Sequence, residues 1–168
     1  MLCYLLTLET NLMNLLDLND PFGISEIAYS DRADTIVGGS NSITFGLDGN
    51  DIITSAYDGA FQMVMGGPGN DSYIINSPGT MTIVDNGNSS NDTVQASGIG
   101  VSSGTTFFGT IDSRHLVITD TASGQELIII NYQDSGNKIE SIQLSNEVFT
   151  YDEIINFIKV SENNLGDH

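Results

Sequence analysis

Four aspartates recur in the first part of the chain, each with an apolar residue two positions later. They are Asp34, Asp51, Asp71 and Asp92, spaced 17, 20 and 21 residues apart. Three of them end turn-forming stretches rich in glycine and asparagine, namely GLDGND, GGPGND and NGNSSND. Carboxylate oxygens are ligands that calcium prefers. The recurrence therefore indicates either a calcium site or a set of tight turns that happen to be acidic.

The stretches between these aspartates alternate between turns and short strands. From about 29 to 76, β-branched and aromatic segments follow each turn. A full period of about eighteen residues returns each Asp-x-apolar unit to the same edge of a solenoid with two parallel sheets. The apolar residues predicted to stack in the core of one sheet are Ile36, Ile53, Tyr73 and Val94. Phe45 and Val64 are predicted to point inward from the other sheet.

This stacking favours a metal ion over acidic turns alone. Equivalent residues in adjacent coils lie about 4.8 Å apart, and calcium binds each oxygen at about 2.3–2.6 Å. One ion could therefore bridge carboxylates from two turns. Without a cation, two carboxylates about 5 Å apart repel by roughly 3 kcal/mol at an effective dielectric of about 20. The sequence predicts that calcium binding and folding are coupled, and that GGPGND at 66–71 is half of a calcium site.

Composition excludes several classes of partner. The 168 residues include 22 acidic and four basic side chains, giving a net charge of −18. Because Arg32, Arg114, Lys138 and Lys159 are scattered, no nucleic-acid partner is predicted. No run of 18 apolar residues occurs, so no membrane span is predicted. Cys3 is the sole cysteine, which excludes an internal disulfide.

Both ends of the chain carry helix patterns, and strands are predicted before the C-terminal one. The N-terminal pattern places four leucines on one helical face, at Leu5, Leu8, Leu12 and Leu16. Near the other end, Thr150 followed by Glu153 forms a capping box. The predicted strands before it are HLVITD, ELIIINY and IESIQL.

The repeats resemble the repeats-in-toxin, or haemolysin-type, calcium-binding family, whose nonapeptide is G-G-x-G-x-D-x-U-x. GGPGNDSYI at 66–74 matches every defined position, and GLDGNDIIT at 46–54 departs only at Leu47. YSDRADTIV at 29–37 keeps only the aspartate and the apolar residue. The chain that follows is similar to the β-rich cap of such secreted proteins, so the resemblance covers about 29–158.

The resemblance implies an all-β fold, a short parallel β-roll followed by a β-rich C-terminal cap, with short terminal helices. Residues 1–26 would form an amphipathic helix that acts as a cap or linker. The calcium-binding repeats would occupy 27–95 and the β-rich cap 96–160. A polar tail would follow at 161–168.

The resemblance also implies a set of calcium ligands. Asp51 and Asp71 would bind through their carboxylates, and Asp34 and Asp92 would add further carboxylates from turns that depart from the repeat. The backbone carbonyls completing the shell would be those of Gly46, Asp48, Asn50, Gly67 and Gly69. The long spacing between Asp51 and Asp71 predicts either a bulge in the intervening chain or a shift of the site.

Family membership would make the chain a calcium-binding structural module of a secreted, extracellular protein. It would be exported by a one-step (type I) secretion system and fold on calcium outside the cell, with a cargo domain elsewhere in the parent protein. Two alternatives stay open: a non-catalytic module that binds a polysaccharide or a protein, and a fragment of a β-helix carbohydrate-active enzyme. Catalysis is not predicted, because no H-E-x-x-H motif and no cysteine–histidine pair is recognisable.

Overall fold

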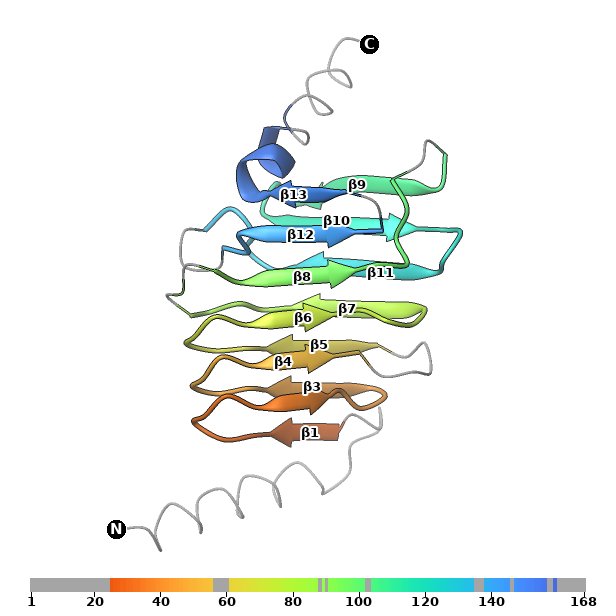
Figure 1. The fold of residues 1–168 in the computed structure, drawn as a ribbon. Coiled ribbons are helices and arrows are strands. Elements are labelled where there is room, and N and C mark those ends of the chain that lie inside the picture. Colours follow the sequence, from red (N-terminus) through yellow and green to blue (C-terminus); the bar gives the residue numbers. More distant parts are fainter. Residues whose placement is uncertain are drawn as a thin grey trace, which may run out of the picture.

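The computed structural model describes residues 25–55, 61–87, 89, 91–101, 104–134, 138–145, 147–156 and 159. These residues form two β-sheets and a short helix at 151–156 (Figure 1). The all-β prediction is confirmed. The predicted N-terminal helix and the polar tail lie outside the described residues.

The first sheet has the strand order β1-β3-β5-β7-β11-β10-β9. Its strands are β1 (Ser25–Ala28), β3 (Ser42–Phe45), β5 (Gln62–Met65), β7 (Gly79–Ile83), β9 (Thr106–Ile111), β10 (His115–Asp120) and β11 (Gln125–Ile129). The pairings from β1 to β11 are parallel. The two pairings that involve β10 are antiparallel, so the sheet is mixed.

The second sheet has the strand order β13-β12-β8-β6-β4-β2. Its strands are β2 (Thr35–Val37), β4 (Ile52–Thr54), β6 (Ser72–Ile74), β8 (Thr93–Ala96), β12 (Ser141–Leu144) and β13 (Val148–Thr150). The pairings from β2 to β12 are parallel, and β13 closes the sheet antiparallel to β12.

From β1 to β8 the chain alternates between the two sheets, and each strand pairs in parallel with the strand two places further on. The turns from the first sheet to the second therefore stack along one edge, at the left of Figure 1. Each of these turns ends at one of the predicted aspartates. The strands that carry these turns thus pair in parallel.

The predicted core stack of the second sheet is confirmed. Ile36, Ile53, Tyr73 and Val94 are successive partners in the parallel register, and each is at most 1% exposed. Burying this continuous row of apolar side chains favours the register in which these strands pair.

The first sheet confirms one of its two predicted core residues. Val64 is fully buried, whereas Phe45 is half-buried and lies on the outer side of β3. Thr44, the register partner of Val64, takes the inward position instead. The prediction for Phe45 was wrong because β3 turns its polar residues, not its apolar ones, toward the core.

The long spacing between Asp51 and Asp71 does not disturb their stacking. Ile52 pairs directly with Ser72, so the strands that follow the two aspartates are in register. The additional residues therefore fall between Thr54 and Gln62, in the connection at the opposite edge.

The predicted strands after the repeats are confirmed as β10, β11 and β12. β11 continues the first sheet beside β7, and β12 continues the second beside β8, so both sheets run on past the aspartate repeats. The capping box is also present. The Thr150 N–H donates to Oε2 of Glu153 at 2.8 Å, and the Glu153 N–H donates to Oγ1 of Thr150 at 3.4 Å.

Candidate metal centre

The structure brings the four predicted aspartates together in a continuous row. The Asp34 N–H donates to Oδ1 of Asp51 at 2.8 Å, and the Asp51 N–H to Oδ1 of Asp71 at 2.8 Å. The Asp71 N–H donates to Oδ1 of Asp92 at 2.7 Å. Glu140 ends the series, accepting the Asp92 N–H at 2.7 Å. We call these five residues the carboxylate ladder. Each acid after Asp34 accepts the backbone N–H of the preceding acid, a role that needs no metal.

The repeated backbone conformation of the turns explains why glycine precedes these aspartates. Leu47 has φ 73° where Gly67 has 98°, and Gly49 has φ 148° where Gly69 has 140°. All four dihedrals lie in the region that favours glycine. The turns also touch directly, since the Gly49 N–H donates to the Pro68 carbonyl at 2.9 Å.

Gly66 shows a second reason for glycine. A Cβ placed there would clash with Oδ2 of Asp71 and with the hydroxyl of Tyr73. The Gly66 N–H donates to that hydroxyl at 3.1 Å. Glycine at position 66 therefore lets the backbone lie close to Oδ2 of Asp71 and the hydroxyl of Tyr73.

In both Asp51 and Asp71, the Oδ2 atom has different surroundings from the Oδ1 atom. Oδ2 of each residue is buried without a hydrogen-bond partner, and both side chains are 1% exposed. Burial is the largest cause that raises the pKa of Asp51, and it raises the pKa of Asp71 to about 6. A buried, unsatisfied carboxylate oxygen is costly, and a cation is one way to satisfy it.

Asp34 and Asp92 are better satisfied. Oδ2 of Asp34 accepts the N–H of Ser30 at 3.0 Å and its hydroxyl at 2.7 Å. Oδ2 of Asp92 accepts the hydroxyl of Ser89. Asp34 is also only half-buried, at the first turn of the row. The ladder therefore differs along its length, and its middle has the greater need of a cation.

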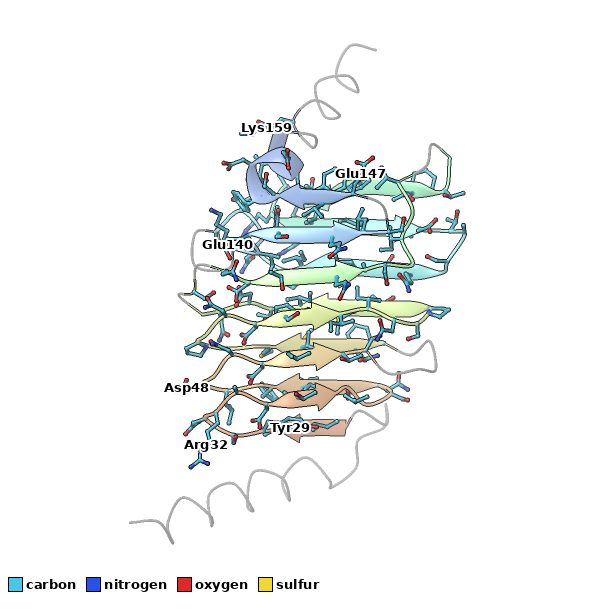
Figure 2. The ribbon with its side chains drawn as sticks, in the orientation of Figure 1. Tyr29, Arg32, Asp48, Glu140, Glu147 and Lys159 are labelled. Atoms are coloured by element: carbon cyan, nitrogen blue, oxygen red, sulfur yellow. The ribbon has the colours of Figure 1, made fainter. Side chains whose placement is uncertain are left out.

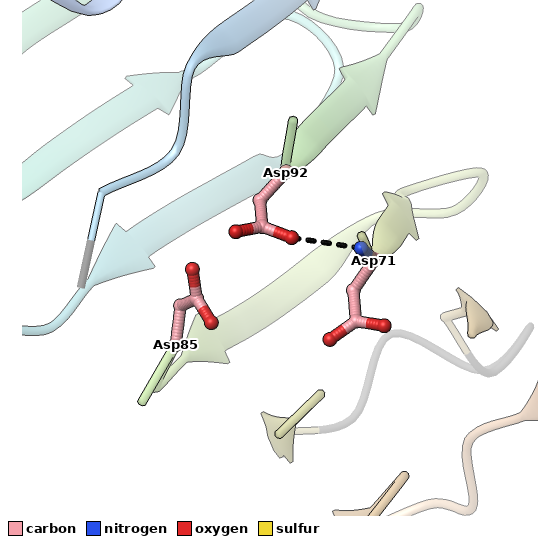
Figure 3. A group of neighbouring side chains, drawn as sticks. All are labelled: Asp71, Asp85 and Asp92. Carbon is pink, nitrogen blue, oxygen red and sulfur yellow. Dashed lines mark hydrogen bonds between the residues drawn. The ribbon is translucent and has the colours of Figure 1, made fainter. Parts of the chain in front are cut away.

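Three buried acids lie close together at this edge, in the turns that precede β6 and β8. One ligand atom from each of Asp71, Asp85 and Asp92 lies within 4.8 Å of the other two (Figure 3). Burial is the main cause that raises the pKa of Asp85 to about 8, followed by its hydrogen bond with Asp92 and the charge of that residue. Burial raises the pKa of Asp92 as well. Ionisation of one of these carboxyl groups makes ionisation of its neighbours less favourable, and a bound divalent cation would offset that repulsion.

Asp85 was missed by the sequence reasoning. Val64 pairs with Ile83, so Asp85 occupies the register position of Gly66. It stands where the repeat has its first glycine, in a longer turn that does not match the nonapeptide. The run TIVDNG, a strand ending in an aspartate before a turn, is the signal that could have indicated it.

The predicted carbonyl ligands lie in the same turns, and their coordination stays a prediction. Gly46 and Gly67 are buried, Gly69 is half-buried, and Asp48 and Asn50 are exposed. The Asn50 side chain has its own role, because its Oδ1 accepts the Asn70 N–H at 2.8 Å.

The ladder edge also carries exposed charges. Figure 2 shows Asp48 at this edge, with Arg32 near its lower end and Glu140 further up.

The buried cluster offers oxygen donors from three carboxyl groups, the donor type that suits calcium and magnesium rather than zinc. It could hold a metal ion.

No family model matches the chain, and no curated protein matches its sequence. In the part of the chain that the structure describes, no helix is long and apolar enough to cross a membrane.

Proposed function

We propose that this chain is a calcium-binding structural module of the repeats-in-toxin type, with its two sheets forming a short parallel β-roll. The alternation of strands between the sheets supports a roll, because each pair of strands forms one coil. The matching turn conformations at Leu47 and Gly67, and at Gly49 and Gly69, support a true structural repeat.

The single observation that carries the proposal is the convergence of Asp71, Asp85 and Asp92. Three buried acids with ligand atoms within 4.8 Å are an expensive arrangement without a cation, because each pair repels by roughly 3 kcal/mol when ionised. Calcium–oxygen distances of about 2.3–2.6 Å fit that separation. The unpartnered Oδ2 of Asp71 supplies an oxygen that the protein does not otherwise satisfy.

Calcium fits these donors better than magnesium. Calcium accepts six to eight oxygens in irregular geometry, whereas magnesium requires a small octahedral shell and keeps most of its water. A site assembled from side chains and carbonyls of stacked turns is irregular. Carbonyl groups of Gly67 and Gly69 lie on the same turn as Asp71 and are proposed to complete the shell.

The proposed role is to couple folding to the calcium concentration. At low cytosolic calcium the charged ladder opposes folding, and at extracellular concentrations bound calcium stabilises the fold. Sites in extracellular modules have dissociation constants of about 10⁻⁴–10⁻³ M, which suits such a switch. The module would then serve a secreted parent protein, through type I export, without catalysing a reaction itself.

Isothermal titration of the full chain with calcium, and separately with magnesium, tests this function. We expect saturable calcium binding at about 10⁻⁴–10⁻³ M and weaker magnesium binding. Asp31→Asn is the matched control, because it removes an exposed charge from the same edge at a residue that is not a predicted ligand. Asp85→Asn should weaken calcium binding where the control does not. Equal binding by both variants, or no calcium binding by the wild type, would contradict the proposal.

A further inference from the structure

Tyr73 brings a hydroxyl group into the buried row of the second sheet. Its register partners are Ile53 in β4 and Val94 in β8, and Tyr73 is as fully buried as they are. An aliphatic side chain fills the core at both neighbouring positions. A buried tyrosine additionally carries a hydroxyl, which normally finds a polar partner. The hydroxyl is therefore what distinguishes Tyr73 from the rest of the row.

The hydroxyl of Tyr73 lies beside the buried acids. The Gly66 N–H donates to it at 3.1 Å. A Cβ on Gly66 would touch both this hydroxyl and Oδ2 of Asp71, so the two oxygens lie around the same point. Gly66 is also the register neighbour of Asp85, through the pairing of β5 with β7. The Tyr73 oxygen thus reaches the metal centre from the core side.

All three acids of the cluster act on this hydroxyl. Burial is the main cause that raises the pKa of Tyr73, and the charges of Asp85, Asp71 and Asp92 raise that pKa further. The interaction between charged groups weakens with distance. The Tyr73 oxygen is therefore close to the same three carboxyl groups that Figure 3 shows together.

The turn that ends at Asp51 shows what the tyrosine adds. There Ile53 takes the place of Tyr73 and offers no oxygen. Gly46 is the counterpart of Gly66, and a Cβ on Gly46 would meet Oδ2 of Asp51 and the Gly66 carbonyl as its nearest oxygens. The tyrosine hydroxyl is therefore an additional oxygen, which the equivalent position in the earlier turn does not have.

We propose that the Tyr73 hydroxyl is a neutral ligand of the ion held by Asp71, Asp85 and Asp92, an inference that rests on the function proposed above. A tyrosine hydroxyl has two lone pairs, and the Gly66 N–H uses one of them. The other is available to a cation. Because a phenol is uncharged at neutral pH, it adds an oxygen without adding to the repulsion among the acids. Calcium binds about six to eight oxygens, so three carboxylates leave positions for such a ligand.

A ligand in this position favours calcium over magnesium. Tyr73 is fully buried, so its hydroxyl meets the ion on the side away from solvent. An ion bound there exchanges a water molecule for a protein oxygen. Magnesium dehydrates reluctantly and usually keeps several waters, whereas calcium accepts an irregular shell of protein oxygens. The hydroxyl should therefore contribute more to calcium binding than to magnesium binding.

Tyr73→Phe in the full chain tests the proposal, because phenylalanine keeps the buried ring and removes only the hydroxyl. Tyr132→Phe is the matched control. Tyr132 is also buried, and its hydroxyl has no hydrogen-bond partner among the residues that the structure describes. Calorimetric titration with calcium should show about tenfold weaker binding in Tyr73→Phe and unchanged binding in the control. Magnesium binding should change less.

Luminescence lifetimes of bound Eu³⁺, compared in H₂O and D₂O, separate a ligand from a structural hydroxyl. Eu³⁺ prefers oxygen ligands as calcium does, and the lifetimes count the water molecules on the ion. Losing the hydrogen bond from Gly66 alone would weaken binding and leave this count unchanged. We expect Tyr73→Phe to hold one more water on the ion than the wild type and the control. An unchanged count in a variant that binds Eu³⁺ would overturn the proposal and leave metal binding intact.

The wild type provides a measurement that does not depend on how the variant folds. With ¹³Cζ-labelled tyrosine, exchange of bound calcium for lanthanum should shift the Tyr73 signal and not that of Tyr132. A Tyr73 signal that does not respond would also overturn the proposal. A wild type that binds neither calcium nor Eu³⁺ would instead overturn the proposed function itself.

Discussion

The N–H of Asp51, which precedes β4, donates a hydrogen bond of 2.8 Å to Oδ1 of Asp71, which precedes β6. The same carboxylate leaves its Oδ2 buried without a hydrogen-bond partner. One side chain thus has a structural oxygen and an unsatisfied one. This division allows the two roles of the ladder to be separated by substitution.

Asp71→Asn should keep the structural role and lose the metal role. The amide oxygen of asparagine can still accept the Asp51 N–H, and the substitution removes a buried negative charge. Without calcium we expect a free energy of unfolding equal to or higher than that of the wild type. Asp71→Ala removes the acceptor as well and should cost about 1–3 kcal/mol, because the Asp51 N–H is left unsatisfied. Urea unfolding in a chelator compares the two variants, and equal destabilisation would contradict the division of roles.

Gly66→Ala should be strongly destabilising. The added methyl group would clash with Oδ2 of Asp71 and the hydroxyl of Tyr73, and we expect a loss of about 1–3 kcal/mol, as in overpacked cores. Gly109→Ala is the control, because a Cβ there meets nothing within 4 Å. Its effect should be within about 1 kcal/mol of zero. Denaturant unfolding of both variants is the measurement, and similar free energies would contradict the close approach at Gly66.

Stability without calcium should fall as the pH rises. Burial raises the pKa of Asp71 to about 6 and is the main cause that raises the pKa of Asp85 to about 8, both above the ordinary value of about 3.9. The folded state therefore binds protons more tightly than the unfolded chain. The resulting stability is fully present below about pH 4 and is lost as the pH passes through about 6 and about 8.

Urea unfolding between pH 5 and pH 8 in a chelator measures this dependence. Saturating calcium should flatten or reverse the slope, because calcium binds the ionised carboxylates. If the protein in the chelator instead became more stable toward pH 8, this prediction would be wrong, because groups other than this cluster would dominate the pH dependence of stability.

Asp85→Gly should convert the third turn to the pattern of the first two. Glycine occupies the equivalent register position at Gly66, so the backbone can accept the change. At pH 9 without calcium, where a carboxyl group with a pKa of about 8 is mostly ionised, we expect a gain of about 1–3 kcal/mol, because a carboxylate repulsion of roughly 3 kcal/mol is removed. Calcium should then add less stability than it adds to the wild type. Thermal unfolding with and without calcium gives both quantities, and a variant less stable in the chelator would contradict the prediction.

Thr150→Ala should weaken the C-terminal helix. The Thr150 hydroxyl donates to Oε2 of Glu153 at 2.9 Å and accepts the Glu153 N–H at 3.4 Å, so alanine removes the cap. Loss of such a cap costs about 0.5–2 kcal/mol. Because the helix follows the edge strand β13, hydrogen exchange of the Ile154 amide should rise more than that of Ile53. Equal effects at both amides would show that the cap is unimportant locally.

The sequence predicted the alignment of the aspartates because strand pairing enforces it. Ile52 must pair with Ser72 for Ile53 to stack on Tyr73, so Asp51 and Asp71 meet whatever the length of the distant connection. The recurrence of the Asp-x-apolar pattern in the sequence is therefore enough to predict that these aspartates align.

Two other features could not be predicted from the repeat. Asp85 lies in a turn that departs from the nonapeptide, and its register position follows only from the pairing of β5 with β7. Phe45 was placed inward because burial normally follows hydrophobicity, whereas β3 places Thr44 inside.

Far-UV circular dichroism of the full chain during a calcium titration tests the central claim most directly, with Asp71→Asn measured in parallel. We predict that the wild type is only partly folded in the chelator at neutral pH and shows a cooperative gain of β-structure at about 10⁻⁴–10⁻³ M calcium. In Asp71→Asn the transition should move to at least about tenfold higher calcium, a change of about 1.4 kcal/mol. A spectrum already fully folded in the chelator and unchanged by calcium in both proteins would contradict calcium-coupled folding.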